Sequence, residues 1–151
     1  MTFLYIILAI VIVIIDRVTK ILAETFIADD QVIGVIPEVF SFVYTENTGA
    51  AFSILSDKTW LLSIVSVAFC VGVIIYWILK KPNKKMLCTS VSLIFAGALG
   101  NAIDRIMYGY VVDFIRTDFI DFPVFNVADI AITIGAALLM IFVIFFDREN
   151  A

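Results

Sequence analysis

Four long apolar stretches run through the chain, and segments richer in polar residues separate them. The stretches lie at 2–22, 59–79, 86–106 and 126–146. Each has about 20 residues, the length that an α-helix needs to cross the hydrocarbon core of a bilayer. A helix also satisfies its backbone polar groups internally, as lipid requires. The pattern predicts an all-α polytopic membrane protein with four transmembrane helices in one membrane domain, 1–151.

The connection 23–58 is too long for a simple turn. Its part 32–45, VIGVIPEVFSFVYT, is rich in Val, Ile, Phe and Tyr, alternates in part, and is broken by Gly34 and Pro37. This composition predicts short strands, forming a small extracytoplasmic β-sheet at the membrane surface. We interpret the more ambiguous segment 107–122 as a short amphipathic or irregular interfacial segment.

Basic residues gather in the connection 80–85, which holds Lys80, Lys81, Lys84 and Lys85. By the positive-inside rule this loop is cytoplasmic. Both termini are then expected to be cytoplasmic, and 23–58 and 107–125 extracytoplasmic. The first stretch lacks a basic start and a small-residue cleavage site, so we expect a retained helix and not a cleaved signal peptide.

Composition strengthens the membrane interpretation, with 63% hydrophobic and 16% charged residues and a mean hydropathy of +1.11. The net charge of -4, without a long basic run, gives no indication of a nucleic-acid partner. The absence of His excludes Ser-His-Asp and Cys-His catalysis and a His-ligated metal. Cys70 and Cys88 lack CxxC spacing and are expected to be packing residues.

Ionisable residues inside apolar spans are costly, by about 2.5–3.5 kcal/mol on insertion scales, and mark candidate functional sites. Asp16 and Lys20 stand four residues apart, the favoured spacing and order for a helical ion pair. One interpretation is a structural pair with Lys20 reaching outward to the interface. The other is a pair that supports a functional site.

Asn101, Asp104 and Arg105 share one face of the third stretch, next to Gly97 and Gly100. Small residues let helices approach closely, which would bury these polar groups together. We expect Arg105 to neutralise a carboxylate, because an unpaired buried Arg is very unfavourable. Arg does not titrate usefully, so we do not expect it to be an acid or base.

Asn126, Asp129 and Thr133 share a face at the start of the fourth stretch. Asn126 suits a helix N-cap. Asp129 either only favours the helix dipole or takes part in chemistry. Asp113 has strongly apolar neighbours, whereas the surroundings of Asp118 and Asp121 indicate an exposed loop.

Asp104, Asp113 and Asp129 are therefore the carboxylates expected in low-dielectric surroundings. Two close carboxylates can share a proton, and such a coupled pair can activate water and polarise a carbonyl. Whether Asp113 and Asp129 lie close together stays open at this point. A proton-coupled carrier and a non-enzymatic assembly or lipid-binding protein are the alternative functions.

The motifs resemble those of bacterial lipoprotein signal peptidase (signal peptidase II), an aspartyl peptidase family. They are IDRVTK at 15–20, ENTGAAFSIL at 46–55, GALGNAIDRIMYGYVVDFI at 97–115 and FPVFNVADIAITIG at 122–135. The resemblance covers nearly the whole chain. It implies an endopeptidase of the bacterial cytoplasmic membrane that cleaves diacylglyceryl-modified prolipoproteins just before the lipidated cysteine.

The resemblance also implies roles for individual residues. Asp113 and Asp129 would be the catalytic aspartates. The residues expected to bind substrate or support the site are Asp16, Lys20, Asn47, Gly49, Asn101, Asp104, Arg105 and Asn126. No metal or organic cofactor is expected, and the protein would act as a monomer among membrane lipids.

Overall fold

The computed structural model describes residues 2–27, 31–49 and 58–146. Within these residues the chain forms four helices and three strands. The helices are α1 (Thr2–Ile27), α2 (Thr59–Lys80), α3 (Lys85–Tyr108) and α4 (Val127–Phe145), and the strands are β1 (Ile33–Ile36), β2 (Phe40–Asn47) and β3 (Val111–Thr117).

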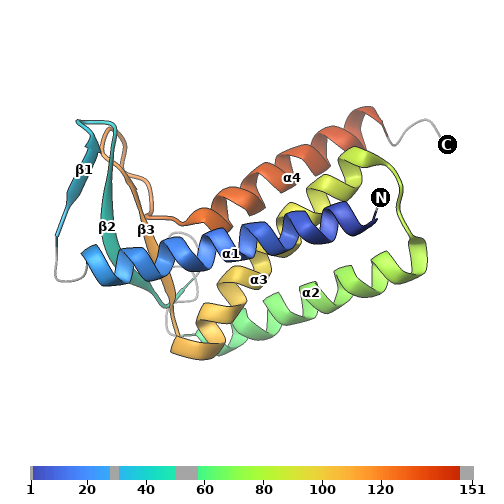
Figure 1. Ribbon diagram of the computed structural model, residues 1–151, viewed down its shortest axis with the longest axis horizontal. Coiled ribbons are helices and arrows are strands. Elements are labelled where there is room, and N and C mark those ends of the chain that lie inside the picture. The colour runs from blue at the N-terminus through green and yellow to red at the C-terminus, as the bar shows by residue number, and fades with distance from the viewer. Residues whose placement is uncertain (1, 28–30, 50–57, 147–151) are drawn as a thin grey trace.

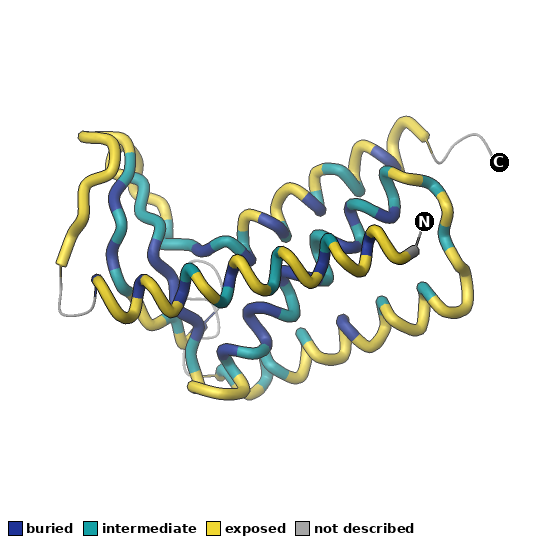
Figure 2. Tube along the Cα trace, in the orientation of Figure 1, coloured by how far each residue is buried: buried dark blue, intermediate teal, exposed yellow. Residues whose placement is uncertain are grey.

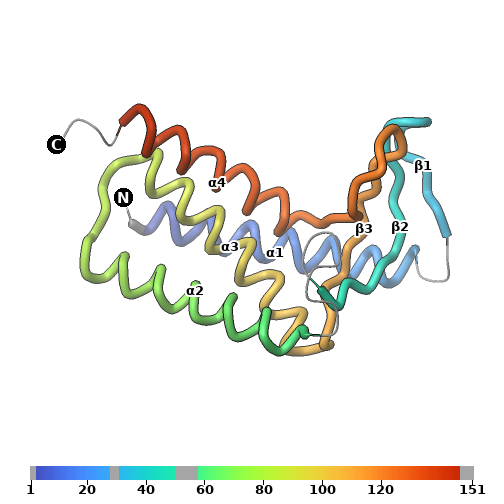
Figure 3. The backbone as a smooth tube through the Cα atoms, turned by 180° about the vertical axis from the view of Figure 1, so that it is seen from behind, coloured from blue at the N-terminus to red at the C-terminus, as the bar shows by residue number. Residues whose placement is uncertain are grey.

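Helix α3 lies at the centre of the helical part, and α1, α2 and α4 each pack against it (Figure 1, Figure 3). Buried positions concentrate on α3, while the outward faces of the other helices are exposed (Figure 2). Those exposed faces are apolar: Ile10, Ile64 and Ile144 are examples. An apolar outer surface around a more polar interior is what a lipid environment selects.

Three of the described helices, α2, α3 and α4, are long and apolar enough to cross a membrane. Helix α1 has 26 residues but carries Asp16, Arg17 and Lys20 in its second half. The helix continues past residue 22, where the predicted span 2–22 ends. The added turn is stabilised by packing, because Ala23 and Ile27 are buried against β3.

The sheet is antiparallel with strand order β1-β2-β3, and it lies at one end of the helices (Figure 1). The connection between α2 and α3 lies at the opposite end. The sheet confirms the strands predicted within 32–45. The interpretation of 107–122 as an amphipathic or irregular segment was wrong in conformation for 111–117, which form β3. Val112 and Phe114 are buried there, and the backbone pairs with β2.

Two local features lead the chain from α3 through β3 to α4. Gly109 ends α3 in the left-handed conformation, with φ of 82°, a value that glycine adopts without strain. After β3 the chain reverses direction and runs back beside the strand. Phe125 there forms two backbone hydrogen bonds with Ile115, at 2.8 and 3.0 Å. This return places the start of α4 beside the middle of β3.

Candidate active site

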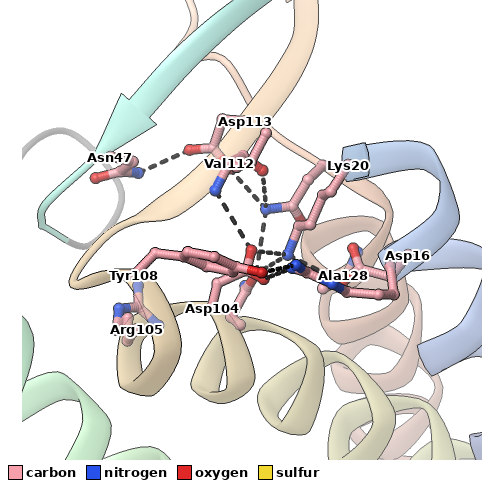
Figure 4. A network of polar contacts seen from close by, with 12 residues as sticks. Asp16, Lys20, Asn47, Asp104, Arg105, Tyr108, Val112, Asp113 and Ala128 are labelled. Carbon is pink, nitrogen blue, oxygen red and sulfur yellow. Dashed lines mark hydrogen bonds and ion pairs between the residues drawn. The ribbon is translucent and has the colours of Figure 1, made fainter. Parts of the chain in front are cut away.

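Asp113 lies in the middle of β3, and its side chain is almost fully buried. Its two carboxylate oxygens accept hydrogen bonds from two different elements. Asn126 Nδ2 donates to Oδ1 at 2.6 Å, and Asn47 Nδ2, from the end of β2, donates to Oδ2 at 2.8 Å (Figure 4). Amide donors therefore hold the carboxylate in one orientation without adding a charge.

Asp129 lies in the first turn of α4, where it forms a capping box with Asn126. The Asp129 backbone N–H donates to Asn126 Oδ1 at 2.9 Å, and the Asn126 N–H donates to Asp129 Oδ2 at 3.2 Å. The predicted N-cap is confirmed. Because Asn126 also donates to Asp113, one buried side chain links both aspartates.

Asn101 provides a second link, from α3. Its Nδ2 donates to Asp129 Oδ1 at 2.8 Å, and its Oδ1 accepts from Lys20 Nζ at 2.9 Å. Asn126 Nδ2 also lies 3.1 Å from this Oδ1. The two asparagines thus connect the aspartates to a cluster of charged residues deeper between the helices.

This charged cluster consists of Asp16, Arg17, Lys20 and Asp104 (Figure 4 labels all of these except Arg17). Lys20 Nζ lies 2.9 Å from Asp16 Oδ2 and 2.8 Å from Asp104 Oδ2. Arg17 Nη1 lies 2.5 Å from Asp104 Oδ1 and also donates from Nη2 to the Tyr108 hydroxyl. Two acids and two bases together make the cluster neutral.

The orientation of Lys20 decides between the two interpretations of the Asp16–Lys20 pair. Lys20 is 1% exposed, so the expectation of an outward-reaching side chain was wrong. Its ammonium group donates inward, since Asp104 on α3 supplies a second carboxylate. Asp16 further accepts from the backbone N–H of Ala128 at 2.9 Å, so it caps the start of α4. The pair therefore ties α1 to α3 and α4.

Gly100 makes this approach possible. A Cβ atom built on Gly100 would lie 2.7 Å from Asp16 Oδ2. Close packing of small residues on α3, predicted from Gly97 and Gly100, is thus confirmed at the position where the carboxylate lies against the helix.

Arg105 is placed differently from the other polar residues of α3. The salt bridges among the described residues do not include it, so the expected direct neutralisation of a carboxylate is not seen. Arg105 Nη2 donates instead to the Gly49 carbonyl oxygen at 3.0 Å, and its buried Nε has no partner among the described residues. Gly49 N–H in turn donates to Asn47 Oδ1 at 2.9 Å. The rest of the ENTGAAFSIL motif, 50–55, lies outside the described residues.

A cavity of about 460 Å³ brings these groups together. Its polar lining comprises Asn47, Asn101, Arg105, Asp113, Asp129 and Thr133, and its apolar lining includes Phe125, Ile130 and Ile134. Asp113 and Asp129 therefore face a common space. The sequence alone could not show that these two side chains lie close together. Burial raises the pKa of Asp113 to about 7, and the nearby charge of Asp129 raises it too, against the lowering effect of the Asn47 and Asn126 hydrogen bonds.

Comparisons with known proteins agree with this arrangement. The family model described as signal peptidase (SPase) II matches residues 8–145. The chain is 48% identical over 136 residues to a lipoprotein signal peptidase of Clostridium tetani (strain Massachusetts / E88), covering 87% of this chain and 86% of that protein. It is 44% identical over 140 residues to one of Pseudoalteromonas translucida (strain TAC 125), covering 88% and 83%.

The chain belongs to the signal peptidase II family. A solved structure, of a bacterial membrane enzyme determined by the in meso method at 2.3 Å resolution, is 37% identical. It matches with a TM-score of 0.88 over 97% of this chain and 90% of that chain. The resemblance inferred from the motifs is thereby confirmed, and the chain is a membrane protease of this family.

The family's motif residues separate into two groups in space. Asn47, Asn101, Arg105, Asp113 and Asp129 line the cavity, while Asp16, Lys20 and Asp104 belong to the charged cluster. The other two predicted site residues contact the first group: Asn126 bonds to Asn101 and Asp113, and Gly49 accepts from Arg105. Asp118 is exposed and pairs with Arg116 at 3.0 Å, and Asp121 is exposed, as expected for loop residues.

Arg17 and Tyr108 were not predicted as partners in the charged cluster. The one indication in the sequence was that Arg17 is next to Asp16. The contact of Arg17 with Asp104 joins residues 87 positions apart, so local spacing does not predict it. Cys70 and Cys88 are buried and unpaired, as expected for packing residues.

Proposed function

We propose that this chain is an aspartic endopeptidase that removes signal peptides from diacylglyceryl-modified prolipoproteins, cleaving before the lipidated cysteine with Asp113 and Asp129 as its catalytic pair. The observation that carries this proposal is the common cavity that both carboxylates line, each held by an asparagine amide. Substrate class and cleavage position follow from the family to which the chain belongs.

Charge balance supports a shared proton in this pair. The cluster of Asp16, Arg17, Lys20 and Asp104 is neutral by itself, so it leaves no cation for the cavity. Arg105 is then the one base among the described cavity-lining residues, facing two acids. A single proton on the pair makes the cavity neutral, which a low-dielectric site favours.

The mechanism uses the two carboxylates in complementary states. The ionised member of the pair takes a proton from water as general base, and the hydroxide formed attacks the scissile carbonyl carbon. The protonated member donates a hydrogen bond to the carbonyl oxygen. The tetrahedral intermediate then collapses as a proton passes to the leaving amine. Asn101 donates to Asp129 and Asn126 donates to Asp113, so the two asparagines keep the carboxylates oriented throughout.

The cavity lining indicates how the substrate would lie. The aspartates are at its polar side, while Ile130, Ile132 and Ile134 on α4 and Phe122 to Phe125 give it an apolar side. An apolar signal segment could run along α4 with its scissile peptide beside the aspartates. Asn47 and Gly49, fixed by Arg105 and Asp113, would border the substrate from the sheet.

We further propose that α1 is a fourth span, that both termini and 80–85 are cytoplasmic, and that the sheet is extracytoplasmic in the bacterial cytoplasmic membrane. The start of α1, the end of α4 and the α2–α3 connection share one end of the molecule, opposite the sheet (Figure 1). Labelling of Asn83→Cys and Asp121→Cys with an impermeant maleimide in spheroplasts tests this. Only Asp121→Cys should react. Labelling of Asn83→Cys alone would show that the protein has the opposite orientation in the membrane.

A gel-shift cleavage assay in detergent tests the function. Its substrate is a diacylglyceryl-modified prolipoprotein, with the unlipidated precursor as control. Asp113→Asn and Asp129→Asn should each abolish cleavage, while the matched variant Asp121→Asn, at an exposed carboxylate, should cleave like wild type. Wild-type turnover in either cavity variant contradicts the catalytic pair. Absence of cleavage by folded wild type would favour a carrier, which a proton-flux assay would reveal.

A further inference from the structure

A second cavity, of about 530 Å³, lies between α1 and α2 in the half of the helices away from the aspartates. Helix α3 forms the base of the cavity with Ser92, Phe95 and Leu99. It runs along α1 from Tyr5 to Ile14, about 14 Å at a rise of about 1.5 Å per residue. That length is about one leaflet of a hydrocarbon core that is about 30 Å thick. We call this cavity the α1–α2 groove.

The walls of the α1–α2 groove suit a hydrocarbon chain. Ile6, Ile10 and Ile14 on α1 face Ile74 and Ile78 on α2, and all five are exposed. Tyr5 and Trp77 close the end of the groove, with ring centroids 6.0 Å apart. The two helices flank α3 (Figure 1), and the lining residues of the groove come from all three helices.

The side chain of Trp77 contributes a polar group to this largely apolar lining. The buried indole Nε1 of Trp77 has no hydrogen-bond partner among the described residues. A buried donor without a partner costs about 1–3 kcal/mol. Protein atoms cover this Nε1, so the indole must turn before an acceptor on a bound molecule can reach it. The donor lies about one helical turn from Lys80 and Lys81, because Lys81 N–H donates to the Trp77 carbonyl oxygen.

Charge decides which molecule fits the groove. Lys80, Lys81, Lys84 and Lys85 lie around the same end of α2 and the start of α3. A signal peptide begins with a basic segment, which these lysines would repel. An anionic phospholipid has the complementary arrangement: a negative headgroup, ester carbonyls just beneath it, and apolar chains below those.

We propose that the α1–α2 groove binds an anionic phospholipid of the membrane. One acyl chain lies along α1 between the isoleucine walls, and the headgroup phosphate lies among the lysines. The Trp77 indole turns so that its Nε1 donates to an ester carbonyl oxygen of the lipid. This site is separate from the cavity of the aspartates. It concerns a bound lipid and not the substrate, so it goes beyond the proposed function.

Fluorescence quenching by brominated lipids tests the proposal, because bromine on an acyl chain quenches only a tryptophan in contact with it. The chain has two tryptophans, at opposite ends of α2, and Trp60→Phe leaves Trp77 as the reporter. This variant is placed in vesicles containing brominated phosphatidylglycerol or brominated phosphatidylcholine. We expect Trp77 to prefer the anionic lipid at least about fivefold, the factor that one lysine near an anionic surface contributes.

Two further variants show whether the preference comes from the groove. Lys80→Gln, Lys81→Gln and Lys85→Gln together should remove it; Lys84 is kept because its ammonium lies 5.5 Å from the centre of the Phe142 ring. Ala9→Phe, which adds a ring to the groove lining, should reduce quenching by both lipids. Trp77→Phe, with Trp60 as reporter, should show no preference. Circular dichroism and gel filtration check that each variant is folded.

Three results would overturn the proposal. They are equal quenching of Trp77 by the two lipids, a preference that survives the lysine substitutions, and relief of quenching by an added signal peptide in wild type and lysine variant alike. The last result would make the groove a substrate site. Because the readout does not depend on cleavage, failure here is distinguishable from failure of the peptidase assignment.

Discussion

Gly97 controls the distance between α3 and α4, and Gly97→Ala should therefore disturb the site without replacing any of its polar residues. A Cβ atom at this position would lie 2.3 Å from the Ala128 carbonyl oxygen and 2.6 Å from Ile132 Cγ1. Ordinary contact begins at 3.4 Å, and backbone cannot rotate aside as a side chain can. The two helices must separate locally by about 1 Å, the difference between 3.4 and 2.3 Å.

The separation acts on the hydrogen bond from Asn101 Nδ2 to Asp129 Oδ1, which joins the same two helices at 2.8 Å. If fully transmitted, it lengthens this bond to about 3.8 Å, beyond the range of about 2.7–3.2 Å for N–H···O bonds. A misplacement of about 1 Å can lower a rate by about 10²-fold. Overpacking of this kind also lowers the free energy of unfolding by about 1–3 kcal/mol.

The assay is kcat/KM for cleavage of the lipidated precursor, with thermal unfolding in detergent measured in parallel. Gly72→Ala is the matched control, because a Cβ at Gly72 meets nothing within 4 Å. Alanine also favours a helix over glycine by about 1 kcal/mol, so this variant should be active and slightly more stable. Wild-type kcat/KM in Gly97→Ala would refute the claim that contact between α3 and α4 positions Asp129.

Three further predictions concern the polar network. The raised pKa of Asp113, about 7, predicts that kcat/KM falls as the pH rises above about 7, because the pair then loses its shared proton; a rate still rising at pH 9 would contradict this. Lys20→Met leaves Asp16 and Asp104 without their shared cation and should lower the free energy of unfolding by about 3–5 kcal/mol. An unchanged unfolding temperature would show that the buried ion pairs do not stabilise the fold. Asn126→Ala should remove the helix cap, at about 1 kcal/mol, and lower kcat more than KM rises; an effect on stability alone would make Asn126 only a cap.

Features that depend on nearby residues could be predicted from the sequence. Apolar stretches of sufficient length indicated α2, α3 and α4 to within two residues at each end. Asn126 with Asp129 three positions later is a local capping pattern, and the capping box is present. The shared face of Asn101 and Asp104 followed in the same way from helical spacing.

Features that depend on distant residues could not be predicted. Segment 111–117 becomes a strand because it pairs with β2, more than 60 positions earlier, and its apolar run alone fits several structures. The last turn of α1, beyond the predicted span 2–22, is stabilised by contact with β3, which the sequence of α1 alone does not indicate. Lys20 points inward because Asp104 lies across the helix interface, a contact that no pattern within α1 contains.

The four carboxylates of the polar network have two kinds of hydrogen-bond partner, and this difference allows them to have different roles. Asp16 and Asp104 contact cations, whereas Asp113 and Asp129 accept hydrogen bonds from neutral asparagine amides. A lysine in place of Asn101 or Asn126 would favour ionisation of both carboxylates and remove the proton that the proposed mechanism requires them to share. An amide orients a carboxylate without that effect. Asn101 lies at the boundary, because its Oδ1 accepts from Lys20 and its Nδ2 donates to Asp129. The cation is thereby fixed next to the site while its charge is balanced by Asp16 and Asp104. Its placement is compatible with the shared proton on Asp113 and Asp129 that the proposed mechanism requires.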